Sequence, residues 1–105
     1  MNITFIESPL FSKYVHEYLS DEEYSVFQVD LAKNPVKGDL IRGGGGLRKI
    51  RCAAKGKGKS GGVRVIYYYL QKNSEIGLVM IFSKSELENI SEKTLKILRK
   101  EMPNA

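Results

Sequence analysis

The period of hydrophobic and polar positions changes several times along the chain, and each change predicts a new element. Residues 2–7 (NITFIE) alternate weakly, as in a short strand. Ser8 and Pro9 then predict the start of a helix, because serine caps helices and proline suits their first turn. The apolar residues that follow fall on one helical face: Leu10, Phe11, Tyr14, Val15 and Tyr18.

A second helix follows directly. Ser20 and Glu23 have the spacing of a capping box, in which each side chain bonds the backbone amide of the other residue. Asn34-Pro35 ends this helix, because the residue before a proline disfavours helical backbone. Its inward positions are apolar apart from one glutamine: Tyr24, Phe27, Gln28 and Leu31.

The second half of the chain predicts three strands and a helix. Residues 47–54, 63–70 and 75–84 are rich in β-branched and aromatic residues, and a polar loop joins the last two strands. If Leu70 opposes Ile76 in that hairpin, Arg64 opposes Phe82. The helix begins after Ser91, with an apolar stripe of Leu95, Leu98 and Met102, and with Lys96, Arg99 and Lys100 near its C-terminal end.

This order, β-α-α-β-β-β-α, predicts an α+β fold with a small, mostly antiparallel sheet, and the 105 residues are expected to form a single domain. The chain lacks a long apolar run, so we expect a cytoplasmic protein without membrane contact. Cys52 is expected to be a small buried residue. With one cysteine and one histidine, His16, no metal site is expected.

Charge is concentrated in one segment. Nine of the 17 basic residues, and no acidic residue, lie between Leu40 and Ser74. Residues 53–60 (AAKGKGKS) also approach the spacing of a phosphate-binding P-loop. That loop needs a following helix, whereas Val63 opens a strand-like run, so we expect a hairpin connection that does not bind nucleotide. The charge therefore favours a surface that meets a polyanion.

Two runs in this segment resemble the RelE/HigB family of bacterial type II toxins, in the RelE/ParE superfamily. The first comprises Gly38, Asp39, Ile41, Gly43, Gly46, Leu47, Arg48, Lys49 and Arg51, and the second is Lys59 to Tyr68. The resemblance covers essentially the whole chain. It implies a toxin that cuts messenger RNA in the ribosomal A site without a metal or other cofactor, and whose partners are a cognate antitoxin, the ribosome and mRNA.

The resemblance also implies catalytic residues at the matching basic positions: Arg64, Lys84, Lys49 and Arg51. The reaction would be attack of a ribose 2′-hydroxyl on the adjacent phosphate, and Arg64 is the first choice for stabilising the phosphorane. Neighbouring cations favour a neutral lysine, so Lys49 or Lys84 could be the base. His16 is expected to be exposed and away from the site.

Further residues are expected to bind RNA or the ribosome by charge or by stacking: Arg48, Lys55, Lys57, Lys59 and Tyr68. For Tyr68, packing beneath the last helix is the alternative interpretation. Phe82 stands where the family often has a tyrosine, so its hydroxyl is missing. Two other functions stay open, namely a ParE-like toxin that poisons DNA gyrase and an inactive relative that only binds nucleic acid.

Overall fold

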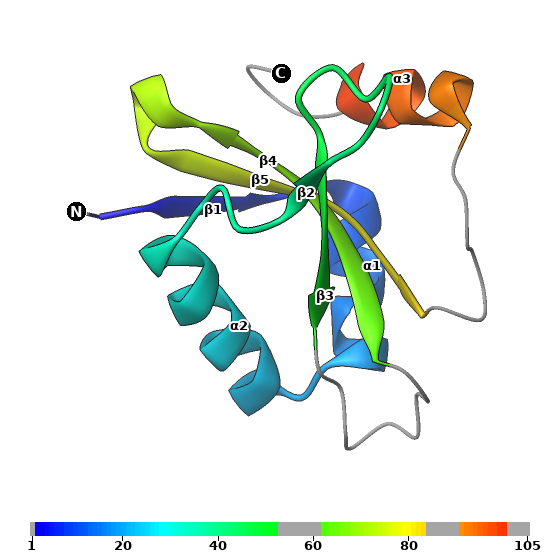
Figure 1. The fold of residues 1–105 in the computed structure, drawn as a ribbon. Helices are drawn as coiled ribbons and strands as arrows, with labels where there is room; N and C mark the ends of the chain where they lie inside the picture. The colour runs from blue at the N-terminus through cyan, green and yellow to red at the C-terminus, as the bar shows by residue number, and fades with distance from the viewer. Residues whose placement is uncertain (1, 53–61, 84–90, 101–105) are drawn as a thin grey trace.

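A computed structural model of the chain describes residues 2–52, 62–83 and 91–100 (Figure 1). The elements in chain order are β1 (Thr4–Glu7), α1 (Pro9–Tyr18), α2 (Asp21–Lys33), β2 (Asp39–Leu40), β3 (Arg48–Cys52), β4 (Val63–Leu70), the 3-10 helix η1 (Gln71–Asn73), β5 (Glu75–Ser83) and α3 (Glu92–Lys100). The predicted α+β order is confirmed, with β2 and η1 as short additions. None of the helices in these ranges is long and apolar enough to span a membrane.

The five strands form one mixed sheet in the order β1-β5-β4-β3-β2. β1 runs parallel to β5, and the other neighbours are antiparallel. β2 was not predicted from the sequence, because two residues are too few to show an alternating pattern. It pairs only with Arg48 and Lys49, so the outer edge of β3 from Ile50 to Cys52 has no partner strand among the described elements.

The predicted helix starts are confirmed. The hydroxyl of Ser8 accepts a hydrogen bond from the Phe11 amide at 3.0 Å and donates one to the Val79 carbonyl at 2.7 Å, so this cap also ties α1 to the sheet. Ser20 and Glu23 form both bonds of the capping box at the start of α2. Ser91 caps α3 by accepting a hydrogen bond from the Thr94 amide.

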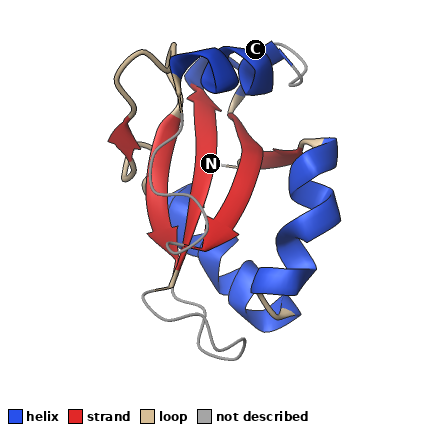
Figure 2. Cartoon of the chain, turned by 90° about the vertical axis from the view of Figure 1, so that its right-hand side faces the viewer, coloured by secondary structure: helices blue, strands red, loops and turns tan. Residues whose placement is uncertain are grey.

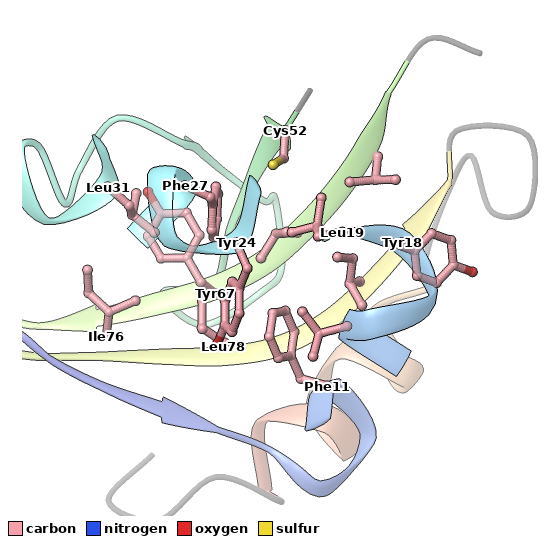
Figure 3. Packing of buried hydrophobic residues seen from close by; sticks show 14 residues of the cluster. Phe11, Tyr18, Leu19, Tyr24, Phe27, Leu31, Cys52, Tyr67, Ile76 and Leu78 are labelled. Carbon is pink, nitrogen blue, oxygen red and sulfur yellow. The ribbon is translucent and has the colours of Figure 1, made fainter. Parts of the chain in front are cut away.

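Each face of the sheet has its own hydrophobic core. On one face, α1 and α2 bury Phe11, Val15, Phe27 and Leu31 against the sheet, with Tyr67 among them (Figure 3). On the other face, α3 packs Leu95 and Leu98 onto Leu47, Ile66 and Tyr68. Figure 2 shows that α3 crosses only one end of this second face, so the opposite end has no covering helix among the described elements.

A β-bulge between β4 and β5 sets which side chains share a face. Arg64 lies opposite Phe82, as predicted, but Leu70 lies opposite Glu75 and not Ile76, because the register shifts between Ile66 and Tyr67. Because β5 has one extra residue at the bulge, the neighbouring residues Val79 and Met80 both contact the hydrophobic core beneath α3. Alternation then resumes, and Phe82 lies on the same face of the sheet. The predicted pairing at the Arg64 end was therefore correct, and that at the Leu70 end was one residue wrong.

The strands on either side of residues 53–61 settle the P-loop question. β3 and β4 pair antiparallel, with Cys52 opposite Val63, so a strand stands where a P-loop would need a helix. The hairpin connection is therefore confirmed, while residues 53–61 themselves lie outside the described ranges. Cys52 is only 7% exposed, as predicted for a small packed residue.

Candidate functional site

The charged residues of β3 and β4 meet in one row across the sheet. Arg51 lies directly opposite Arg64, which in turn lies opposite Phe82 on β5. Residues at such positions have Cβ atoms about 5 Å apart and point to the same side. Phe82 and Ile66 belong to the α3 core, so both arginines share the sheet face that α3 partly covers.

Lys49 occupies the next row on this face, opposite the buried Ile66. It is exposed, as is Arg51, whereas Arg64 is half-buried. The structure thus brings together three of the four predicted catalytic residues. We call Lys49, Arg51 and Arg64 the basic face.

Like charges directly opposite each other on a sheet destabilise it. Arg51 and Arg64 are such a pair, whereas Lys49 lies opposite the exposed Asp39 of β2, which partly balances its charge. An anion placed between the two arginines would relieve their repulsion, and the planar guanidinium fork suits a phosphate. The charges and positions of the basic face therefore suit a phosphate group.

Arg48 does not belong to the basic face. It lies opposite Tyr67, on the side of the sheet covered by α1 and α2. Its guanidinium donates hydrogen bonds to the carbonyls of Gly38 at 2.7 Å and Val36 at 3.2 Å. These bonds do not support the expected RNA contact and favour a role in holding the chain before β2. The alternation of β3 already places Arg48 and Lys49 on opposite faces.

Tyr68 is also not available for stacking on a base. It is 2% exposed, beneath α3, with the guanidinium carbon of Arg99 4.7 Å from its ring centroid. Burial raises the pKa of its hydroxyl above the ordinary value, although the nearby Arg99 acts in the opposite direction. The structure therefore supports the packing alternative and contradicts an RNA-stacking role for Tyr68 in this conformation.

A groove of about 430 Å³ lies on the other side of β3, between its unpaired edge and α2. Its walls include Val26, Phe27 and Cys52, and its rim carries Glu22, Glu23 and Asp30 together with Arg51. These carboxylates would repel a polyanion. Burial raises the pKa of the Cys52 thiol to about 11, and Glu23 and Asp30 add to this effect.

Four predicted residues, Lys84, Lys55, Lys57 and Lys59, lie outside the described ranges. The side chain of His16 is 65% exposed on α1 and its Nδ1 lies 3.4 Å from a carboxylate oxygen of Asp21, so its predicted exposure is confirmed. Helix α1 packs on the face of the sheet opposite the basic face. Among the described residues, no group of histidine, cysteine and acidic side chains could hold a metal ion.

Two residues of this region were not singled out by sequence reasoning. Asp39 was noted only as part of a motif, and its position opposite Lys49 depends on β2, which has no sequence signal of its own. Arg99 was expected to interact with the helix dipole, but it reaches the sheet at Tyr68. Its spacing from Leu95 places it one turn along the buried side of α3, which is the signal that could have found it.

The fold and the basic face define a class, namely a small α+β domain with a cluster of basic residues on one face of its sheet. The family model described as the RelE toxin of the RelE / RelB toxin-antitoxin system matches residues 5–103. The chain belongs to this family, and is thus a toxin whose expected partner is an antitoxin. The E. coli toxin RelE, solved as a double mutant in the free state, has a similar fold, with a TM-score of 0.60 and 13% identity over 94% of this chain and 98% of that one.

Proposed function

We propose that this toxin is a ribosome-dependent endoribonuclease that cuts messenger RNA. The observation that carries the proposal is the position of Arg51 directly opposite Arg64 at the end of the sheet that α3 does not cross, with Lys49 in the next row. The three cations of the basic face can bind the reacting phosphate and one neighbouring phosphate. RelE-family membership supports RNA as the source of that phosphate.

The chemistry that fits these groups is transfer of the phosphate to the neighbouring 2′-hydroxyl. The 2′-oxygen forms a bond to phosphorus as the bond from phosphorus to the 5′-oxygen breaks, which leaves a 2′,3′-cyclic phosphate and a free 5′-hydroxyl. Arg64 stabilises the negative charge that develops on the phosphorane oxygens, because a half-buried arginine is held in place more firmly than an exposed one.

Two proton transfers complete the reaction. A base takes the proton from the 2′-hydroxyl, and an acid donates one to the leaving 5′-oxygen. Lys49 on the basic face and Lys84 just after β5 are the proposed groups, with Arg51 holding the phosphate. The described part of the basic face contains no histidine, since the chain's single one lies on α1.

The proposed partners are mRNA, the ribosome and an antitoxin, in the cytoplasm. Lys55, Lys57 and Lys59 are proposed to meet the ribosomal or messenger phosphates, because they follow β3 directly from the Arg51 end. No cofactor is needed for the reaction as proposed, since the cations come from the chain itself.

Primer extension on a defined mRNA tests this function. The purified protein is incubated with that mRNA, with and without programmed ribosomes, beside Arg64→Ala and the control Lys72→Ala. Lys72 is an exposed cation of η1, at the far end of the β4-β5 hairpin from Arg64. We expect cuts within the reading frame that require the ribosome, a loss of about 10²–10³ in rate for Arg64→Ala, and wild-type cleavage for Lys72→Ala.

Absence of cleavage from a wild-type protein that still arrests growth would overturn the nuclease. That outcome would direct the search to DNA gyrase, the target of the ParE-like alternative. Cleavage that Arg64→Ala retains in full would keep the nuclease and remove Arg64 from its mechanism.

A further inference from the structure

Arg99 of α3 is held in place from two directions. Its guanidinium carbon lies 4.7 Å from the ring centroid of Tyr68, and its Nε donates a hydrogen bond of 3.1 Å to the carbonyl of Gly45. Tyr68 is almost fully buried, and Gly45 lies in the turn before β3, with a positive φ of 63°. The side chain of Arg99 is thus fixed by contacts from two other parts of the fold.

Most of the hydrogen-bond donors of this arginine have no acceptor among the described residues. A guanidinium has five N–H groups, of which the Nε group reaches Gly45. Nη1 is buried and has no hydrogen-bond partner within the part of the chain that the structure describes. A buried donor without an acceptor costs free energy, so an oxygen ligand that reaches Nη1 would offset that cost.

The position of Arg99 extends the basic face along the sheet. Arg64, Ile66 and Tyr68 follow one another at every second position of β4 and share one face. At about 3.3 Å per residue, Tyr68 lies roughly 13 Å from Arg64 along the strand. Lys49 stands opposite Ile66, between the two ends. The cations therefore follow a line from the Arg51 and Arg64 row to α3.

We propose that Arg99 binds a backbone phosphate of single-stranded RNA, one that is different from the reacting phosphate at Arg64. The proposal rests on the nuclease function, which it deepens by extending the substrate site along β4 to α3. Stacking on Tyr68 and the bond to Gly45 limit the rotamer freedom of Arg99, so less entropy is lost when its fork meets a phosphate. Arg99 contacts the substrate away from the reacting atoms, so it contributes to binding and not to the chemical step.

A set of variants at this position distinguishes the effect of the Arg99 charge on RNA binding from the effect of the side chain on the packing of α3. Arg99→Gln keeps a side chain that can bond Gly45 but removes the charge, and Arg99→Lys keeps the charge but loses the fork. Lys96→Ala is the matched control, since Lys96 is exposed on the same helix. Thermal unfolding of each variant reports on the packing of α3.

Binding is measured with ribosomes programmed with an mRNA that carries a 2′-deoxy sugar at the cleavage site, over a series of salt concentrations. We expect Arg99→Gln to weaken binding about tenfold and to lower the salt slope of log K by about 0.7, the value for one phosphate contact on a single strand. Arg99→Lys is expected to keep the salt slope while binding less tightly, and Lys96→Ala to bind like the wild type.

Cleavage of the all-ribose mRNA by the same proteins separates this proposal from the nuclease function. Arg99→Gln should raise the half-saturating concentration and leave the maximal rate within about threefold of the wild type. Wild-type binding by a folded Arg99→Gln would overturn the proposal. If Arg99→Gln does not fold, a lower salt slope of log K for Arg99→Lys than for the wild type would overturn the proposal. Absence of cleavage by the wild type would overturn only the nuclease function, because binding is measured separately.

Discussion

The hydroxyl of Tyr67 accepts a hydrogen bond of 2.8 Å from the backbone amide of Gly38 and donates one of 2.9 Å to the carbonyl of Pro35. These bonds link the middle strand of the sheet to the segment between α2 and β2. A Cβ atom at Gly38 would lie 2.8 Å from the Tyr67 ring, so this close approach requires glycine. Together with Arg48, Tyr67 therefore fixes the chain that leads to Asp39 and the basic face.

Tyr67→Phe tests this link. The change leaves the buried Gly38 amide without its acceptor, so we expect the free energy of unfolding to fall by about 1–3 kcal/mol. Tyr69→Phe is the control, because Tyr69 is half-buried and makes no hydrogen bond within the described ranges. Urea unfolding followed by circular dichroism measures both, and an equal effect of the two variants would contradict the role given to the Tyr67 hydroxyl.

Arg48→Ala and Arg51→Ala should separate structure from binding on neighbouring residues of one strand. Arg48 bonds the carbonyls of Val36 and Gly38, so its removal is expected to lower stability by about 1–3 kcal/mol with little change in the binding of programmed ribosomes. Arg51→Ala should weaken that binding and leave the melting temperature within a few degrees. Calorimetry and a binding titration check both, and the reverse pattern would place Arg48 at the interface.

Tyr68 should act through packing. Tyr68→Phe keeps the buried ring beneath α3 and is expected to bind programmed ribosomes like the wild type. Tyr68→Ala removes a nearly fully buried aromatic side chain and should lower the free energy of unfolding by about 3–5 kcal/mol. A Tyr68→Ala variant that unfolds at the same urea concentration as the wild type would contradict the packing role.

The Cys52 thiol should be unreactive at neutral pH, because its pKa of about 11 leaves almost no thiolate. We expect slow labelling by a disulfide reagent at pH 8 and fast labelling in urea. Since the folded pKa exceeds the ordinary value of 9.0, the stability from the neutral thiol is complete below pH 9 and is lost as pH rises toward 11. Between pH 9 and pH 11, the free energy of unfolding of the wild type should therefore fall by up to about 2 kcal/mol relative to that of Cys52→Ala. Fast labelling of the folded protein would contradict the burial of this residue.

Replacing Lys55, Lys57 and Lys59 together by alanine should weaken association with the ribosome. The loss should shrink as salt rises, because phosphate contacts by lysine are screened and release counterions. Association at several salt concentrations measures this. A loss that does not depend on salt would indicate a catalytic role for these lysines.

The sequence by itself determined the features that depend on neighbouring residues. The caps at Ser8 and Ser20 involve residues three positions apart, so their signals are local and both helices begin as predicted. The alternation of β3 gave the shared face of Lys49 and Arg51, and the strand after Gly62 excluded a P-loop. The concentration of charge likewise needed only a count along the chain.

Only the tertiary structure decided how that face is used. Alternation gives two faces of a strand, but it does not say which end of a face a helix will cover. α3 buries Tyr68 beneath Arg99 and crosses only one end of this face (Figure 2), and this outcome depends on contacts between residues far apart in the sequence. The bulge on β5 and the pairing of Asp39 with Lys49 are also long-range features. Packing free energy, which no local pattern records, therefore decided which predicted residues share the exposed site.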